Sequence, residues 1–64
     1  MVKINGEYVD VSGKTVLDYL TLAGYDSKRV AVELNGDIVP KSQYSEIVFK
    51  DDDNVEVVSF VGGG

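Results

Sequence analysis

The 64-residue chain contains no cysteine and no histidine. Without cysteine it has no disulfide, no zinc–thiolate site and no thiol nucleophile of its own. Without histidine it lacks the usual general base near neutral pH and the commonest metal ligand. These absences argue against a small enzyme and against a metal centre. They also leave the apolar core to hold a very small fold together without cross-links.

Basic side chains are scarce, since six Lys and Arg stand against 11 Asp and Glu, for a net charge of −5. Proteins that bind nucleic acid or anionic membranes do so with clustered Lys and Arg. The composition therefore predicts no nucleic-acid partner and no membrane partner, and it favours proteins with basic surfaces. No apolar run approaches the ~20 residues of a membrane span, and the polar residues Lys3 to Glu7 do not fit a secretion signal. We expect a cytoplasmic protein.

The length supports one hydrophobic core, and 44% apolar with 27% charged residues is the balance of a folded domain. Alternating residues predict a hairpin within Met1–Val11, turning at Asn5-Gly6, where both residues tolerate the positive φ of a type I′ turn. A helix is predicted over about Val16–Ala23. Its signals are Thr15 as N-cap, Asp18 at the N3 position and Gly24 as the stop.

Further strands are predicted at Val30–Leu34, at Asp37–Val39 after an Asn-Gly turn, and at Val55–Phe60, with one helical turn at Lys41–Tyr44. The helix is too short to persist alone, so it must lie on a sheet. This order predicts an α+β fold of the β-grasp type, a roll of four to five mixed strands with the last strand between or beside the first two. We expect a domain over residues 1–61 and a flexible glycine tail over residues 62–64. The expected core consists of Val2, Ile4, Val9, Val11, Val16, Leu17, Leu20, Val32, Leu34, Val55 and Val57.

The end of the sequence carries the strongest functional signal. If Val55 and Val57 point inward, the pleat turns Val58 and Phe60 outward, next to Val61. An outward apolar group of this kind is typical of a partner contact. Gly62 and Gly63 would form a thin leader that fits a narrow channel, and Gly64 presents an unhindered carboxylate.

Such a carboxylate can attack the α-phosphate of ATP, and the acyl-adenylate then accepts a sulfur or amine nucleophile. The chain has no phosphate-binding loop, so the ATP chemistry would belong to a partner enzyme. The alternative is a non-covalent interaction module with an incidental, frayed glycine end. Asp51–Asp53 is interpreted as a solvated turn rather than a metal site, and the four tyrosines as packing residues.

Several segments together resemble the sulfur-carrier proteins of thiamine biosynthesis, the ThiS family. They are Val30–Pro40, Tyr44, Asp51–Asp53 and Val55–Gly64, and the resemblance extends over essentially the whole chain. One residue departs from the family pattern: Asp52 stands where the family usually has glycine. We expect that turn to have relaxed to a geometry without positive φ.

The resemblance implies a ubiquitin-like β-grasp fold and a carrier role without a bound cofactor. An E1-like adenylating enzyme would activate Gly64, and sulfur released by a cysteine desulfurase would convert it to a thiocarboxylate. Thiazole synthase would then receive the sulfur. Gly62, Gly63, Val58, Phe60 and Val61 would contact the partners. The small subunit of molybdopterin synthase, with the same chemistry and another acceptor, is the alternative within this class.

Overall fold

The computed structural model describes residues 1–60. Val61 and Gly62–Gly64 lie outside the described residues, so the domain boundary at residue 61 and the flexible tail stay predictions. No helix within residues 1–60 is long and apolar enough to cross a membrane. The elements are β1 (Val2–Ile4), β2 (Glu7–Val9), α1 (Val16–Leu22), β3 (Val30–Leu34), β4 (Asp37–Ile38), a 3₁₀ turn η1 (Lys41–Gln43) and β5 (Asn54–Ser59).

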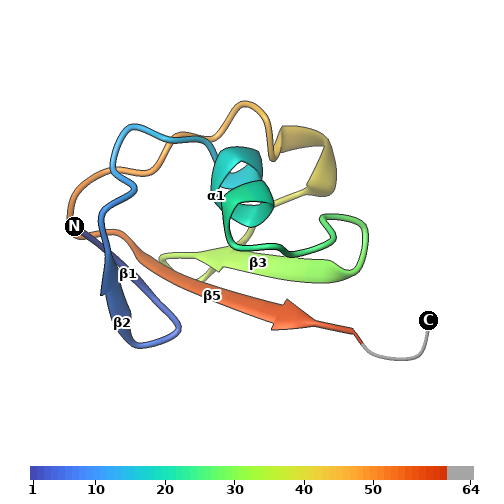
Figure 1. Ribbon diagram of the computed structural model, residues 1–64, viewed down its shortest axis with the longest axis horizontal. Helices are drawn as coiled ribbons and strands as arrows, with labels where there is room; N and C mark the ends of the chain where they lie inside the picture. The colour runs from blue at the N-terminus through green and yellow to red at the C-terminus, as the bar shows by residue number, and fades with distance from the viewer. Residues whose placement is uncertain (61–64) are drawn as a thin grey trace.

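These strands form one mixed sheet in the order β2-β1-β5-β3-β4, and α1 packs across one face of it (Figure 1). The pairing of β1 with β5 is parallel, and the other three pairings are antiparallel. The prediction of a β-grasp roll with a mixed sheet is confirmed. The last strand lies beside β1 and separates it from β3.

Helix α1 begins and ends where its capping residues predict. The Asp18 amide donates to Thr15 Oγ1 over 3.0 Å, and the Thr15 amide donates to Asp18 Oδ2 over 3.2 Å, which completes a capping box. Gly24 follows with φ of +83°. The helix buries Val16 and Leu20, which are one turn apart. Leu17 was predicted to be buried and is 36% exposed, because a helix of two turns presents only one row of residues to the sheet.

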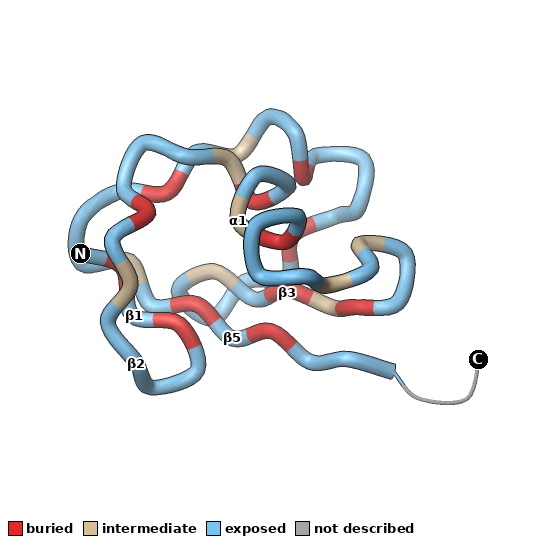
Figure 2. Tube along the Cα trace, viewed as in Figure 1, coloured by how far each residue is buried: buried red, intermediate tan, exposed pale blue. Residues whose placement is uncertain are grey.

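The core lies between α1 and the sheet, beneath the loop that precedes β5 (Figure 2). Most of the expected core residues are buried, but Val9 and Leu34 are only partly so. Residues outside regular strands complete the core, and Phe49 is among the largest fully buried side chains. The buried residues absent from the expected core are Val30, Val39, Phe49 and Tyr44, of which Tyr44 was expected to pack.

Both Asn-Gly turns have the predicted geometry, with φ of 51° and 84° at Asn5 and Gly6 and 52° and 89° at Asn35 and Gly36. The expectation for Asp52 is wrong, since its φ is +70°. Its amide donates to the Met1 carbonyl over 2.8 Å, and the Asp53 carboxylate accepts from the Lys50 amide over 2.8 Å. These bonds hold the left-handed turn, and aspartate tolerates that conformation better than most residues do.

Asp52 therefore carries a backbone strain that glycine would relieve. We expect Asp52→Gly to raise the free energy of unfolding by roughly 0.5 kcal/mol, since the strain relieved slightly exceeds the entropy that glycine loses. Asp52→Ala is the matched control and should lower that free energy by about 1 kcal/mol. Urea unfolding of the three proteins measures both changes. Equal stability of the glycine and alanine variants would contradict this assignment.

Candidate functional site

The exposed apolar residues at the end of β5 lie on the face of the sheet opposite α1, called here the open face. Val55 and Val57 are buried on the helix side, and the residues between them point to the open face. Val58 is 56% exposed and Phe60 is 53% exposed, which confirms that both are outward. Val61, the third predicted member of this group, and Gly62–Gly64 lie outside the described residues.

The pairing of β3 with β5 determines what surrounds Val58. Ala31 is opposite Val58, and Glu33 is opposite Glu56. Because Ala31 is small, it leaves Val58 accessible. The neighbouring carboxylates of Glu33 and Glu56 repel each other. The open face thus joins an apolar end at Val58 and Phe60 to an acidic middle. This arrangement suits a partner with apolar contacts bordered by basic groups.

Strand β5 is held on both edges. On one edge β3 pairs with it over five residues, and the Phe60 amide donates to the Arg29 carbonyl over 2.7 Å. On the other edge β1 pairs with it only at Asn54 and Val55. Beyond Val55 the Asn5 side chain bonds to β5 in place of the β1 backbone. Its Nδ2 donates to the Val57 carbonyl over 3.2 Å, and its Oδ1 accepts from the Val57 amide over 2.8 Å. The sequence marked Asn5 as a turn residue and gave no sign of this second role.

The acidic turn before β5 is built from its own hydrogen bonds. The Asp51 carboxylate accepts from the N-terminal ammonium and from the Ser12 hydroxyl, and these two bonds lower the pKa of Asp51. Asp53 accepts from the Asn35 side chain over 3.0 Å. Within residues 1–60 no group of three or more acidic side chains is arranged to hold a metal ion. The backbone forms the predicted turn at Asp51 and Asp52.

Three of the four tyrosines pack against the core, as predicted. Burial raises the pKa of Tyr19 and Tyr44, so both hydroxyls stay protonated near neutral pH. Tyr25 packs beside Tyr19, with ring centroids 6.4 Å apart. Tyr8 does not pack against the core and is 69% exposed, because β2 is an edge strand. The ammonium of its partner residue Lys3 lies over the Tyr8 ring, 5.9 Å from the centroid.

Two pockets of about 370 and 290 Å³ lie at the other end of β3. Both are lined by Leu34, Asn35 and Ile47, and neither includes Val58 or Phe60. Val58 and Phe60 are each more than half exposed, so the end of β5 presents a surface that is suited to contact with another protein.

Comparison with known proteins agrees with this geometry. A model of the ThiS family matches residues 2–64. The chain belongs to the ThiS family. It is 40% identical over 68 aligned positions to the sulfur carrier protein ThiS of Bacillus subtilis, with all of both chains covered. The crystal structure of a thiamine biosynthesis protein (ThiS) from Geobacter metallireducens superposes with a TM-score of 0.77 at 33% identity, covering 98% of this chain and 97% of that one.

The same chain also resembles part of a larger protein. It is 48% identical over 62 residues to a thiazole synthase of Paramagnetospirillum magneticum. That match covers 95% of this chain but only 19% of the relative. This chain thus spans about a fifth of the length of the thiazole synthase that it matches.

The Asn5 side chain should matter for stability because it replaces backbone pairing on one edge of β5. We expect Asn5→Gly, which keeps the positive φ, to lower the free energy of unfolding by about 1–3 kcal/mol through the two lost hydrogen bonds. Asn5→Ala should lower it by about 1 kcal/mol more, since alanine resists this φ. Thermal unfolding measures both. A glycine variant as stable as the parent would show that the side chain adds nothing.

Proposed function

We propose that this protein is a sulfur carrier for thiazole formation in thiamine biosynthesis, with the Gly64 carboxyl as the site of loading. The observation that carries this proposal is the end of β5. A strand held on both edges exposes Val58 and Phe60 and continues in the sequence into Val61 and three glycines. The names of the ThiS relatives support the same role.

In the first proposed step, an oxygen of the Gly64 carboxylate attacks the α-phosphorus of ATP, and pyrophosphate leaves. An E1-like enzyme binds the ATP and catalyses this step. A sulfur nucleophile then attacks the acyl carbon, and AMP leaves with the carboxylate oxygen. Where a cysteine desulfurase delivers the sulfur as a persulfide, a thiol must supply the two electrons that break the S–S bond. The product is a thiocarboxylate.

This chain contributes recognition and a reactive end, and the partners contribute catalysis. Val58, Phe60 and Val61 would anchor a partner, since a few apolar contacts carry most of the energy of an interface. Gly62 and Gly63 would pass through a channel too narrow for a Cβ atom. Thiazole synthase is the proposed acceptor, and the names of the two longer relatives support that connection.

Two alternatives predict different behaviour. A small subunit of molybdopterin synthase would share the loading chemistry and differ in acceptor, but membership of the ThiS family favours thiazole synthase. A non-covalent interaction module would need the open face and not the carboxyl. Extending the chain beyond Gly64 by one bulky residue separates loading from binding.

Loading of Gly64 can be measured directly by intact mass. After incubation with ATP, cysteine, a desulfurase and the cognate activating enzyme, we expect a gain equal to the exchange of one oxygen for one sulfur, localised to Gly64. A variant with tryptophan added after Gly64 should gain nothing. Gly63→Val should load far more slowly, with an unchanged melting temperature. An unchanged mass with an enzyme that loads another ThiS carrier would overturn the proposal.

The apolar anchor can be tested with a matched pair of exposed residues. Phe60→Ala should weaken binding to the activating enzyme by about tenfold or more, as expected for a central aromatic contact. Leu22→Ala, which removes a similarly exposed residue from α1, should leave binding unchanged. Isothermal calorimetry gives both affinities. Equal effects of the two changes would show that the open face is not the contact surface.

A further inference from the structure

Residues 28–30 form hydrogen bonds on two sides. On one side the donor is the backbone amide of Phe60, and on the other it is the side chain of Lys41. Within β3, successive carbonyls point to opposite edges. The Arg29 carbonyl points to β5 and accepts from the Phe60 amide. The Val30 carbonyl points to the other edge, where β4 would have to pair with it. The Lys28 carbonyl belongs to the turn before β3, in which the Arg29 amide donates to the Asp26 carbonyl over 2.9 Å.

β4 does not reach that far. The Val39 amide donates to the Val32 carbonyl over 2.9 Å, and the next residue is Pro40, which has no N–H. The chain then turns away into η1. By the register of β3 with β4, Lys41 is the residue that would have been opposite Val30.

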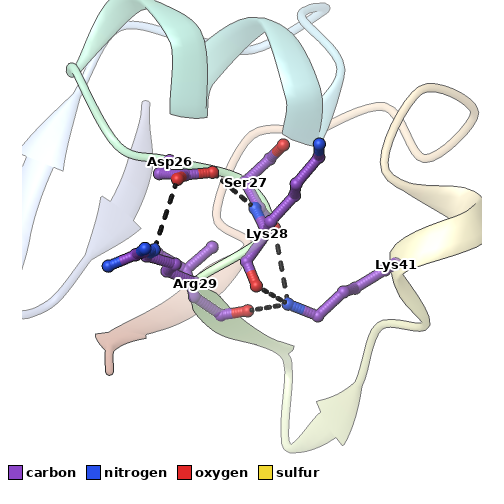
Figure 3. A network of polar contacts seen from close by, with 6 residues as sticks. Asp26, Ser27, Lys28, Arg29 and Lys41 are labelled. Atoms are coloured by element: carbon purple, nitrogen blue, oxygen red, sulfur yellow. Dashed lines mark hydrogen bonds and ion pairs between the residues drawn. The ribbon is translucent and has the colours of Figure 1, made fainter. Parts of the chain in front are cut away.

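The side chain of Lys41 supplies the missing donors. Its Nζ lies 2.9 Å from the Lys28 carbonyl oxygen, 3.0 Å from that of Val30 and 3.5 Å from that of Ser27 (Figure 3). The Tyr44 hydroxyl also donates to the Val30 carbonyl, over 3.3 Å. An ammonium group is a strong donor with three hydrogens, so one side chain can satisfy several carbonyls at once.

We propose that Lys41 is a positioning residue for sulfur loading: its ammonium group holds residues 28–30, and these residues hold Phe60 in register. This inference rests on the proposed function, since it deepens the role of Phe60 as an anchor. Arg29 lies between Lys28 and Val30, whose carbonyls accept the two shorter bonds from Lys41. Its own carbonyl accepts from the amide of Phe60, the residue directly after β5. Without the ammonium, the Lys28 carbonyl loses this donor, and the Val30 carbonyl keeps only the longer bond from the Tyr44 hydroxyl.

The expected consequence is local. Phe60 is adjacent to the residues that precede Gly64 in sequence, and the proposed partner must bind Phe60 and the carboxyl together. If Phe60 is not held in place before binding, the partner must order it, which weakens recognition but does not alter the chemical step. Lys41→Met should therefore raise the KM for the carrier roughly five- to thirtyfold, about the factor for ordering one backbone residue. The kcat should not change.

The experiment compares Lys41→Met with two controls in the full chain. Lys28→Met removes a like charge from the segment between α1 and β3 but leaves the Lys28 carbonyl, which accepts from Lys41, in place. Lys41→Arg keeps a charged donor. Amide hydrogen exchange of Phe60 and Val57, followed by NMR, measures the local effect. Steady-state pyrophosphate release with the activating enzyme gives KM and kcat.

We expect faster exchange at Phe60, unchanged exchange at Val57 and a raised KM in Lys41→Met only, with at least partial recovery in Lys41→Arg. Unchanged exchange at Phe60 in Lys41→Met, or an equal KM change in Lys28→Met, would overturn the inference. Unfolding of both Lys41→Met and Lys41→Gln would also overturn it, because Lys41 would then act on the whole fold. If the parent protein is not loaded at all, the proposed function fails, while the exchange at Phe60 still tests the role of Lys41.

Discussion

The hydrogen bonds along both edges of β5 join the beginning, middle and end of the described chain. β5 pairs with β1 in parallel and with β3 in antiparallel fashion, so residues more than 50 positions apart in sequence meet in the sheet. The inner side chains of the same strand, Val55 and Val57, form part of the core beneath α1. The outer ones, Val58 and Phe60, form the candidate contact surface. Core and surface are therefore built on alternate residues of one strand.

Short strands in this sheet are continued by side chains. β1 ends at Ile4, and the Asn5 side chain bonds with Val57 in its place. β4 ends at Ile38, and Lys41 provides donors to the carbonyls that β4 does not reach. The Asn35 side chain likewise accepts from the Asn54 amide over 2.9 Å. Polar side chains at turns can thus satisfy the backbone of a small sheet without longer strands.

Local signals in the sequence predicted the local structure well. The Asn-Gly pairs, Thr15 with Asp18, and Gly24 each require a particular backbone geometry, and that geometry is present. The outward position of Val58 and Phe60 was predictable because successive side chains of a strand point to opposite faces of the sheet. The burial of Phe49 could not be predicted in this way, because no periodic element contains it. The roles of Asn5 and Lys41 depend on partners 52 and 11 residues away, which a pattern of neighbours does not reveal.

The central place of β5 has a consequence for synthesis of the protein. A ribosome makes β1 first and β5 more than 40 residues later, so the emerging chain cannot close its sheet until β5 has left the exit tunnel. Until then β1 and β3 lack the strand that separates them. Chains released before β5 is made cannot complete the sheet, and such unfolded chains are removed by proteases. A chain that folds has therefore been translated at least through β5, which ends a few residues before the glycines.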